Sequence, residues 1–466
     1  MSTTPPTVAR TTFWTLDRVA DALAPLASGN LPRGSRVFGR VWTDTRTIES
    51  GDLFVALVGE RFDAHDFLKD AVAKGAAGVV VSRVDKAAGI GVPVFEVWDT
   101  LVALGALGTG RRRAWNKPVV SVVGTNGKTS TKELLRAALG SVFEVHATTG
   151  NLNNLIGVPL TLLAIPDGAD VAVIEMGTNQ PGEVPKLRAI AEPNVTVVTS
   201  IAEEHLEGLG DLEGVMREEL AAAEGVPVAV VPASQADVVD AAKARAKRVV
   251  AAGLDAGDLH PSEWGIEPDG RGWMLLEGQR VEVPLRGGHN LRNATLAIAV
   301  ARELGISIAD AARGIASMPS PPMRVAVETH GPVMLINDAY NSNPGSARAA
   351  LELLQHAGAG RQRAAVLGTM LELGSHTPRL HDEVARAALD GGIELVAGIG
   401  EFAAALSRIA PDDPRVITAD DVDGLWMQLS ARLDANPVIL LKGSRGMRLE
   451  RLVQPIVTWA ASQPES

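Results

Sequence analysis

Short apolar runs that alternate with amphipathic stretches dominate the chain and predict an α/β protein. Residues 78–81 and 119–123 consist almost entirely of valine, which is typical of strands buried on both faces of a parallel sheet. Between such runs lie stretches with helical periodicity, for example residues 13–27, where Thr15 is placed to cap the first turn. This regular alternation of strands and helices implies open, mostly parallel sheets.

A chain of 466 residues exceeds what one hydrophobic core supports, and the pattern divides it into three domains. A polar connector separates a smaller N-terminal α/β domain, residues 1–113, from a central domain, residues 114–322, with a mostly parallel sheet. A proline-rich junction then leads into a Rossmann-like α/β domain, residues 323–466. The three arginines at 111–113 are interpreted as the solvated end of a helix.

The central domain opens with a pattern that suits nucleotide phosphates. The strand at 119–123 is followed by a loop and a helix start formed by Gly124, Thr125, Asn126, Gly127, Lys128, Thr129 and Ser130. Backbone N–H groups of such a loop face the phosphates, Lys128 neutralises the outer ones, and the Thr129 hydroxyl can ligate Mg²⁺. Val122 stands where the complete motif has a glycine, so an ordinary strand–turn–helix connection is the alternative. The favoured interpretation is a phosphate-loop ATPase domain.

Polar side chains follow two later strands of the same domain. Glu175 ends one apolar run and His205 follows another, and ligands of α/β sheets bind at the carboxyl ends of the strands. Both are candidate Mg²⁺ ligands. The alternatives are a surface glutamate at a strand end and an ordinary histidine. Asn290 and Asn293 share one face of a helix start, where one is expected to cap the helix and the other to reach a ligand such as adenine.

Composition narrows the classes of function. A net charge of −11 argues against a nucleic-acid partner, and the absence of cysteine excludes disulfides and thiolate metal sites. The first residues lack the features of a signal peptide, and no apolar run approaches the ~20 residues that a bilayer crossing needs. We therefore expect a cytoplasmic enzyme without a membrane span.

Taken together, these stretches resemble the Mur ligases, the ATP-dependent amide ligases that build the peptide stem of bacterial cell-wall precursors. The resemblance extends over residues 44–448. Residues 124–129 and 289–293 carry motifs of the whole superfamily. Three further stretches resemble the branch of the family that adds a D-alanyl-D-alanine dipeptide: residues 150–159, 338–344 and 442–445.

The resemblance implies a role for each matching residue. The catalytic set would be Lys128, Glu175, His205 and Arg324, and two Mg²⁺ ions would be organised by Thr129, Glu175 and His205. The binding residues would be Asn290 and Asn293 near the adenine, Arg324 and Asp338 closing over ATP, Thr45 and Arg46 on the uridine nucleotide, Asn151 in the loop facing the muramoyl peptide, Asn343 in substrate binding, and Lys442 and Arg445 in the domain that presents the dipeptide.

Two positions depart from the family pattern. Many Mur ligases carry a carbamoylated lysine after the metal-binding histidine, but this chain has no lysine between Lys186 and Lys243. Glu219 stands at the equivalent position and brings the carboxylate that carbamoylation would create, either as a Mg²⁺ ligand or as a group behind one. Thr369 stands where the resemblance leads us to expect aspartate.

The activity that the resemblance implies is ligation of D-alanyl-D-alanine to a UDP-muramoyl-tripeptide through an acyl phosphate, with ATP and Mg²⁺, in peptidoglycan precursor synthesis. These substrates are small molecules, and we expect a monomer with a hinge at residues 319–324. The alternatives are a sister ligase that adds a single amino acid, a ligase like folylpolyglutamate synthase, a switch or transport ATPase, and an inactive binding module. The long segment before the phosphate loop disfavours the folylpolyglutamate synthase alternative.

Overall fold

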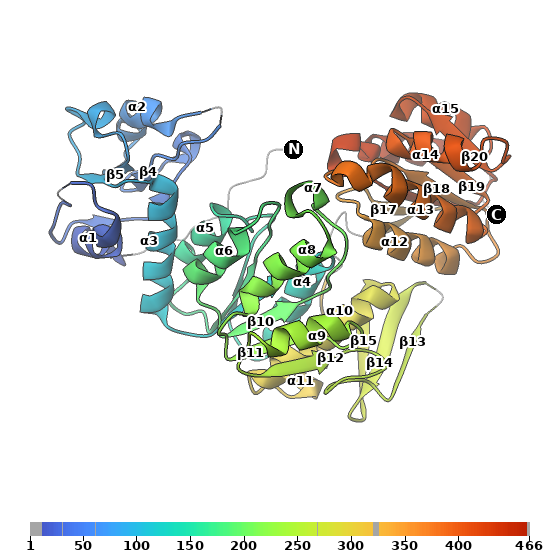
Figure 1. Ribbon diagram of the computed structural model, residues 1–466, viewed down its shortest axis with the longest axis horizontal. Coiled ribbons are helices and arrows are strands. Elements are labelled where there is room, and N and C mark those ends of the chain that lie inside the picture. Colours follow the sequence, from blue (N-terminus) through green and yellow to red (C-terminus); the bar gives the residue numbers. More distant parts are fainter. Residues whose placement is uncertain (1–11, 30, 61, 268, 320–325, 464–466) are drawn as a thin grey trace.

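Figure 1 shows three α/β units that follow one another along the chain, coloured blue, green to yellow, and orange to red. The structure is a computed structural model that describes residues 12–463 apart from residues 30, 61, 268 and 320–325. The predicted α/β class with mostly parallel sheets is confirmed. The two domain boundaries stay predictions. A bilayer crossing needs a long, apolar helix, and the described part of the chain contains none.

The N-terminal unit is built on a parallel sheet of order β3-β4-β5-β6, beside an antiparallel pair β1-β2. Helix α1 (Leu16–Leu23) begins where predicted, because Thr15 Oγ1 accepts the N–H of Arg18 at 3.2 Å. It ends earlier than predicted, since Pro25 cannot continue it and residues 24–26 form a 3₁₀ turn. The other elements are β1 (Trp14–Thr15), β2 (Val37–Phe38), β3 (Val41–Trp42), β4 (Leu53–Val55), β5 (Gly78–Val81), β6 (Val94–Glu96) and α2 (Leu68–Ala73).

The central unit holds a parallel sheet of order β12-β11-β10-β7-β9-β8. The strand β7 (Val119–Val123) lies between β10 (Val195–Val198) and β9 (Val171–Glu175), and it is buried throughout. Alternate side chains of β7 belong to two different hydrophobic clusters, which explains its uninterrupted apolar run. The elements around it are β8 (Val145–Ala147), β11 (Val228–Pro232), β12 (Val249–Ala252), α4 (Lys128–Leu139), α5 (Gly157–Leu163), α6 (Glu183–Ala191), α7 (Leu206–Leu209), α8 (Leu212–Leu220) and α9 (Ala236–Lys243).

An antiparallel sheet of order β13-β14-β15 and two helices complete the central unit. Helix α10 (Gly288–Glu303) contacts α4 and strands of both sheets, so it ties the antiparallel sheet to the parallel one. The N-terminal end of α10 thereby lies beside the loop that follows β7. The remaining elements are β13 (Glu263–Ile266), β14 (Arg271–Leu276), β15 (Gln279–Arg286) and α11 (Ile308–Ala316).

The C-terminal unit has a sheet of order β16-β17-β21-β18-β19-β20, with β16 antiparallel at one edge and the other strands parallel. The register of β17 (Val333–Asp338) and β21 (Val438–Lys442) places Asp338 opposite Lys442, so the polar ends of both strands meet at one edge. The other elements are β16 (Ala326–His330), β18 (Arg363–Leu367), β19 (Leu395–Ile399), β20 (Val416–Ala419), α12 (Pro344–Ala357), α13 (Thr377–Asp390), α14 (Glu401–Ile409), α15 (Val422–Ser430) and α16 (Val453–Ala460).

Helix α3 (Thr100–Trp115) joins the first two units and crosses the predicted boundary at residue 113. The interpretation of its three arginines as a solvated end was wrong for two of them. Arg111 and Arg112 are buried, and the Arg112 guanidinium donates to the carbonyls of residues 191 and 192 at 3.0 and 3.1 Å. Those carbonyls lie at and just past the end of α6, where helix carbonyls lack partners within the helix. The buried arginines therefore anchor α3 to the central unit.

We expect Arg112→Met to lower the free energy of unfolding by about 2–3 kcal/mol, because buried carbonyls lose a charged donor. The measurement is urea denaturation followed by circular dichroism. Arg113→Met is the matched control, since Arg113 is 68% exposed and pairs with Glu192 at the surface. A surface pair of this kind contributes about 0–1 kcal/mol. Equal losses in the two variants would contradict the anchoring role.

Candidate active site

A cavity of about 1030 Å³ lies where the strand ends of the central and C-terminal units face each other. Its lining comes from the loops after β7, β9 and β10, from the start of α10, and from the segments after β17 and β21. A cavity of this size is at the upper end of the range typical of small-molecule sites. The residues predicted from the sequence that line it are Thr125, Asn126, Gly127, Lys128, Thr129, Ser130, Asn151, Glu175, His205, Asn290, Asn293, Asp338, Asn343, Lys442 and Arg445.

The phosphate loop, residues 124–130, adopts the compact turn that its glycines allow. Gly124 and Gly127 have φ values of +117° and +85°, a region that favours glycine. A Cβ at Gly124 would lie 2.5 Å from the hydroxyl of Thr199, so no larger residue fits there without rearrangement. Helix α4 begins at Lys128, within this stretch, and points the positive end of its dipole into the cavity.

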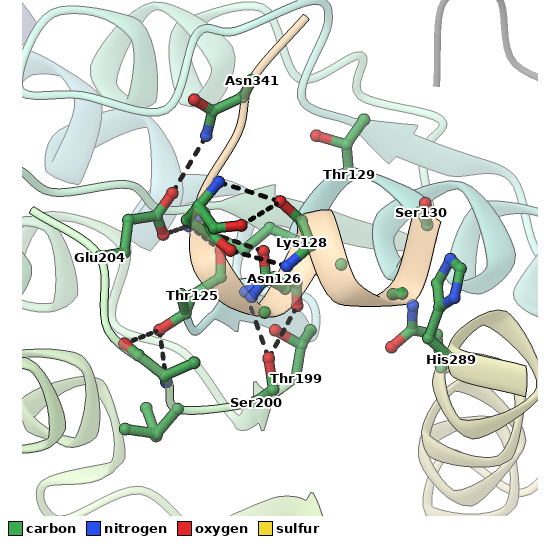
Figure 2. A pocket seen from close by; sticks show the side chains of 18 of the residues that line it. Thr125, Asn126, Lys128, Thr129, Ser130, Thr199, Ser200, Glu204, His289 and Asn341 are labelled. Carbon is green, nitrogen blue, oxygen red and sulfur yellow. Dashed lines mark hydrogen bonds and ion pairs between the residues drawn. The ribbon is translucent and has the colours of Figure 1, made fainter. Parts of the chain in front are cut away.

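Lys128 folds back over the phosphate loop. Its ammonium donates to the carbonyls of Gly124 and Thr125, the latter at 3.2 Å, and lies 4.0 Å from a carboxylate oxygen of Glu204 (Figure 2). The charge of Lys128 is thus held at the loop, and its contact with phosphates stays a prediction.

Glu175 ends β9 and is held from three sides. Its two carboxylate oxygens accept the Thr129 hydroxyl and the Asn153 amide, each at 2.9 Å. Its backbone N–H donates to the hydroxyl of Thr148 at 2.9 Å. Glu175 is 2% exposed, so its carboxylate is fixed next to the helix start. The structure brings Thr129 and Glu175 together, as a shared role at a cation requires.

His205 follows β10 and adopts a left-handed backbone conformation, with φ of +52°. One ring nitrogen, Nδ1, is hydrogen-bonded to the carboxylate of Glu372 in the C-terminal unit. The other, Nε2, lies 3.9 Å from Glu204. Among the described residues, no three histidine or acidic side chains are assembled to hold a metal ion, so the predicted Mg²⁺ sites stay predictions. The oxygen donors that fit Mg²⁺ best are the adjacent side chains of Thr129 and Glu175.

Glu219 lies on α8, behind the phosphate loop rather than in the lining of the cavity. Its carboxylate accepts the backbone N–H of Gly124 at 2.8 Å. Burial raises the pKa of the Glu219 carboxyl, and the nearby charge of Lys128 opposes that rise. This hydrogen bond fixes Gly124, the first residue of the loop. The role of Glu219 as a Mg²⁺ ligand, or as a group behind one, stays a prediction.

The start of α10 packs directly on the phosphate loop. A Cβ at Gly127 would lie 2.7 Å from the side-chain nitrogen of Asn293. Asn290 and Asn293 are both inside the helix, so the expectation that one of them caps it was wrong; Gly287 occupies the N-cap. Their amides are held by hydrogen bonds to Arg286 and between themselves. Both side chains line the cavity, where an adenine contact stays a prediction.

The C-terminal unit contributes a paired cation and anion. Lys442 forms an ion pair with Asp338 at 2.8 Å and donates to the carbonyl of Asn341 at 2.6 Å. The guanidinium of Arg445 lies over the ring of Tyr340, 5.7 Å from its centre. Arg324 lies outside the described residues, as does most of the predicted hinge.

Like Gly124 and Glu219, the positions Thr45, Arg46 and Thr369 do not line the cavity. Thr45 and Arg46 are in the N-terminal unit, where Arg46 is 85% exposed and pairs with Asp44 at 2.7 Å. That pairing lowers the pKa of Asp44. The predicted role of Thr45 and Arg46 in holding a uridine nucleotide therefore concerns a surface of the N-terminal unit, separate from the cavity. It stays a prediction. Thr369 accepts the backbone N–H of Glu401 at 3.0 Å and supports the start of α14.

Known proteins resemble this chain in sequence and in structure. Residues 122–301 match the family model of the Mur ligase middle domain, and residues 323–445 match that of the Mur ligase glutamate ligase domain. A relative from Escherichia coli, named UDP-N-acetylmuramoyl-tripeptide–D-alanyl-D-alanine ligase, is 34% identical over 95% of this chain and 98% of its own. A Bacillus subtilis relative of the same name is 32% identical over 95% of this chain and 99% of its own. The chain belongs to the Mur ligase family. The resemblance noted in the sequence is thereby confirmed.

Solved structures of MurF ligases share the fold of this Mur ligase. MurF from Acinetobacter baumannii superposes with a TM-score of 0.87 at 30% identity, over 96% of this chain and 99% of that one. The MurF ligase from Thermotoga maritima, solved in complex with ADP, gives 0.81 at 26% identity over 91% and 98%. A Mycobacterium tuberculosis folylpolyglutamate synthase gives 0.61 at 22% identity over 78% of this chain and 95% of that one, which shows a shared fold alone.

Sequence reasoning missed Glu204, Asn153 and Glu372. Glu204 is 7% exposed and lies between Lys128 and the C-terminal unit of this Mur ligase. Its place directly before His205 at a strand end was a usable signal, because residues after parallel strands gather at one edge. Asn153 belongs to the asparagine-rich stretch at 150–154, so the sequence carried a signal for it. Glu372 comes from a loop 167 positions away from its partner His205, which no local pattern indicates.

His289 predicts the direction in which the stability of this Mur ligase changes with pH. Partial burial in the cavity wall lowers the pKa of His289 to about 4 from 6.5, although the charge of Asp338 opposes the shift. The unfolded chain therefore binds a proton between pH 6.5 and 4 that the folded chain does not bind. This contribution to stability is complete above pH 6.5 and is lost as the pH falls toward 4.

We expect His289→Gln to lose less stability than the parent chain between pH 7 and pH 4.5, as urea midpoints measured across about five pH values would show. His260→Gln is the control, since His260 lies on the surface away from the cavity. Parallel pH curves for His289→Gln and the parent chain would contradict the burial of a neutral imidazole.

Proposed function

We propose that this Mur ligase joins D-alanyl-D-alanine to UDP-N-acetylmuramoyl-tripeptide at the expense of ATP, in the synthesis of peptidoglycan precursors. The observation that carries the proposal is one cavity that combines a phosphate loop, the Thr129–Glu175 pair and a cation from the C-terminal unit. Relatives that align along the whole chain bear the name of this reaction.

The chemistry is amide synthesis from a carboxylate, whose negative charge repels an amine. We propose that the terminal carboxylate of the tripeptide attacks the γ-phosphorus of ATP, forming an acyl phosphate and releasing ADP. The free amine of the dipeptide then attacks the acyl carbon, the amide bond forms, and inorganic phosphate leaves with a proton lost from the amine. The protein supplies positioning and charge neutralisation rather than a covalent nucleophile.

Each unit has a share in this scheme. Lys128 and the N-terminus of α4 would face the transferred phosphate. Thr129 and Glu175 would hold Mg²⁺, with His205 at a second ion, and Mg²⁺ would neutralise phosphate charge there. The remaining assignments are Asn290, Asn293, Arg324 and Asp338 around ATP, Thr45 and Arg46 on the uridine nucleotide, Asn151 near the muramoyl peptide, and Lys442 and Arg445 near the dipeptide. A monomeric chain acting in the cytoplasm on small molecules, without nucleic acid, completes the proposal.

The test is phosphate release from ATP with purified protein, UDP-N-acetylmuramoyl-tripeptide and either D-alanyl-D-alanine or single amino acids. We expect release with the dipeptide and product of the ligated mass by mass spectrometry. Lys128→Met should lower kcat/KM by about 10³-fold, because a preorganised charge at the transferred phosphate is lost. Lys69→Met, at an exposed position of the N-terminal unit, is the control. Turnover with single amino acids alone would favour a sister ligase.

A second test concerns Glu219, for which we propose a role in holding the loop without touching the cation. Glu219→Gln keeps an acceptor for the N–H of Gly124, so we expect kcat/KM within about threefold of the parent. Glu219→Ala removes it and should cost about tenfold. Glu213→Gln, 75% exposed on the same helix, is the control. A tenfold rise in the Mg²⁺ concentration that Glu219→Gln needs for half-maximal activity would instead identify a ligand.

A further inference from the structure

The loop that leads into α12 makes two hydrogen bonds to the nucleotide-binding elements of the central unit. The side-chain amide of Asn343 donates to the Asn126 Oδ1 atom of the phosphate loop at 2.8 Å. Two residues earlier, the amide of Asn341 donates to Glu204 at 3.1 Å, and Figure 2 shows the pair beside Lys128. The partners lie 217 and 137 positions apart in the chain.

Asn126, whose side chain is the acceptor on the phosphate loop, has its backbone held by Ser200. The N–H of Asn126 donates to the hydroxyl of Ser200 at 3.2 Å, and that hydroxyl lies 3.3 Å from the carbonyl of Asn126. With its backbone held by Ser200, Asn126 extends its side chain to Asn343 of the C-terminal unit. A Cβ at Gly345 would lie 3.0 Å from the Asn126 side-chain nitrogen, so a glycine gives the close approach its space.

The two donors are equally fixed. Asn343 is the N-cap of α12, and its Oδ1 atom accepts the N–H of Ser346 at 2.8 Å, which turns its NH₂ group toward Asn126. The carbonyl of Asn341 accepts the ammonium of Lys442 at the end of β21. Asn343 therefore uses both ends of its side-chain amide. The oxygen accepts from its own helix, and the nitrogen donates to the central unit.

The second hydrogen bond reaches the phosphate-binding lysine through one side chain. Glu204 is 7% exposed, accepts from Asn341, and lies 4.0 Å from the Lys128 ammonium. The loop of the C-terminal unit thus contacts both the phosphate loop itself and the carboxylate beside its lysine.

We propose that Asn341 and Asn343 are positioning residues that dock the C-terminal unit onto the phosphate loop and onto Glu204. Docking by this clasp, the pairs Asn343–Asn126 and Asn341–Glu204, aligns the Asp338–Lys442 edge with the nucleotide. In this role Asn343 contacts the protein rather than substrate. The link to catalysis rests on the function proposed above, whereas docking itself is independent of it.

The first test is a double-mutant cycle on kcat/KM. Asn343→Ser keeps an N-cap hydroxyl but removes the donor to Asn126, and we expect a loss of about fivefold, the value of one neutral hydrogen bond. In an Asn126→Ala background the same change should cost less than twofold. Ser346→Ala weakens the capping box of α12 without touching the clasp, and serves as the control. Equal losses from Asn343→Ser in both backgrounds would overturn the proposal.

The second test measures docking without turnover. The chain has no cysteine, so Lys243→Cys on α9 and Met427→Cys on α15 accept two dyes specifically. Single-molecule energy transfer then gives the ratio of docked to undocked chains. We expect Asn343→Ser to lower that ratio about fivefold and Ser346→Ala to leave it within twofold. An unchanged ratio in Asn343→Ser, or an equal fall in both variants, would overturn the clasp even if ligation were absent.

Discussion

The position of β7 between β9 and β10 is the constraint on which the rest of the site depends. The three strands are parallel and in register, with Val122 beside Glu175 and Val123 beside Val198. Because β7 is buried on both faces, it can present polar groups only beyond its carboxyl end. The phosphate loop, the Glu175 carboxylate and the segment before His205 therefore emerge at one edge, within reach of a single ligand.

Preorganisation of this edge comes from contacts behind it. Glu219 holds the first N–H of the phosphate loop, Ser200 holds its middle, and Asn293 packs on Gly127. The buried carboxylate of Glu175 accepts hydrogen bonds from Thr129 and Asn153, and the backbone N–H of Glu175 donates to Thr148. Groups fixed in this way need little reorganisation when charge moves during phosphoryl transfer, which is how a site without a nucleophile accelerates its reaction.

The sequence predicted the parts of the site that follow from local patterns. A valine strand, a glycine turn and a helix start place Lys128, and strand ends place Glu175 next to Thr129. It could not predict the parts that depend on distant chain segments. The carbonyls that bury Arg112 come from the end of α6, and the partner of His205 comes from the C-terminal unit. Both partners lie far away in the chain, so no local pattern around Arg112 or His205 indicates them.

The C-terminal unit repeats the same principle, with a lysine and a carboxylate at the end of its own strands. The register of β17 and β21 sets Asp338 beside Lys442 at a second sheet edge, and this edge faces the first across the cavity. Under the proposed function neither edge is complete alone, since one carries the predicted phosphate-binding groups and the other a buried cation paired with its carboxylate. A reaction that first creates and then consumes an acyl phosphate needs both at once. The hydrogen bonds between residues 341–343 and the central unit are therefore as much part of the site as its charges.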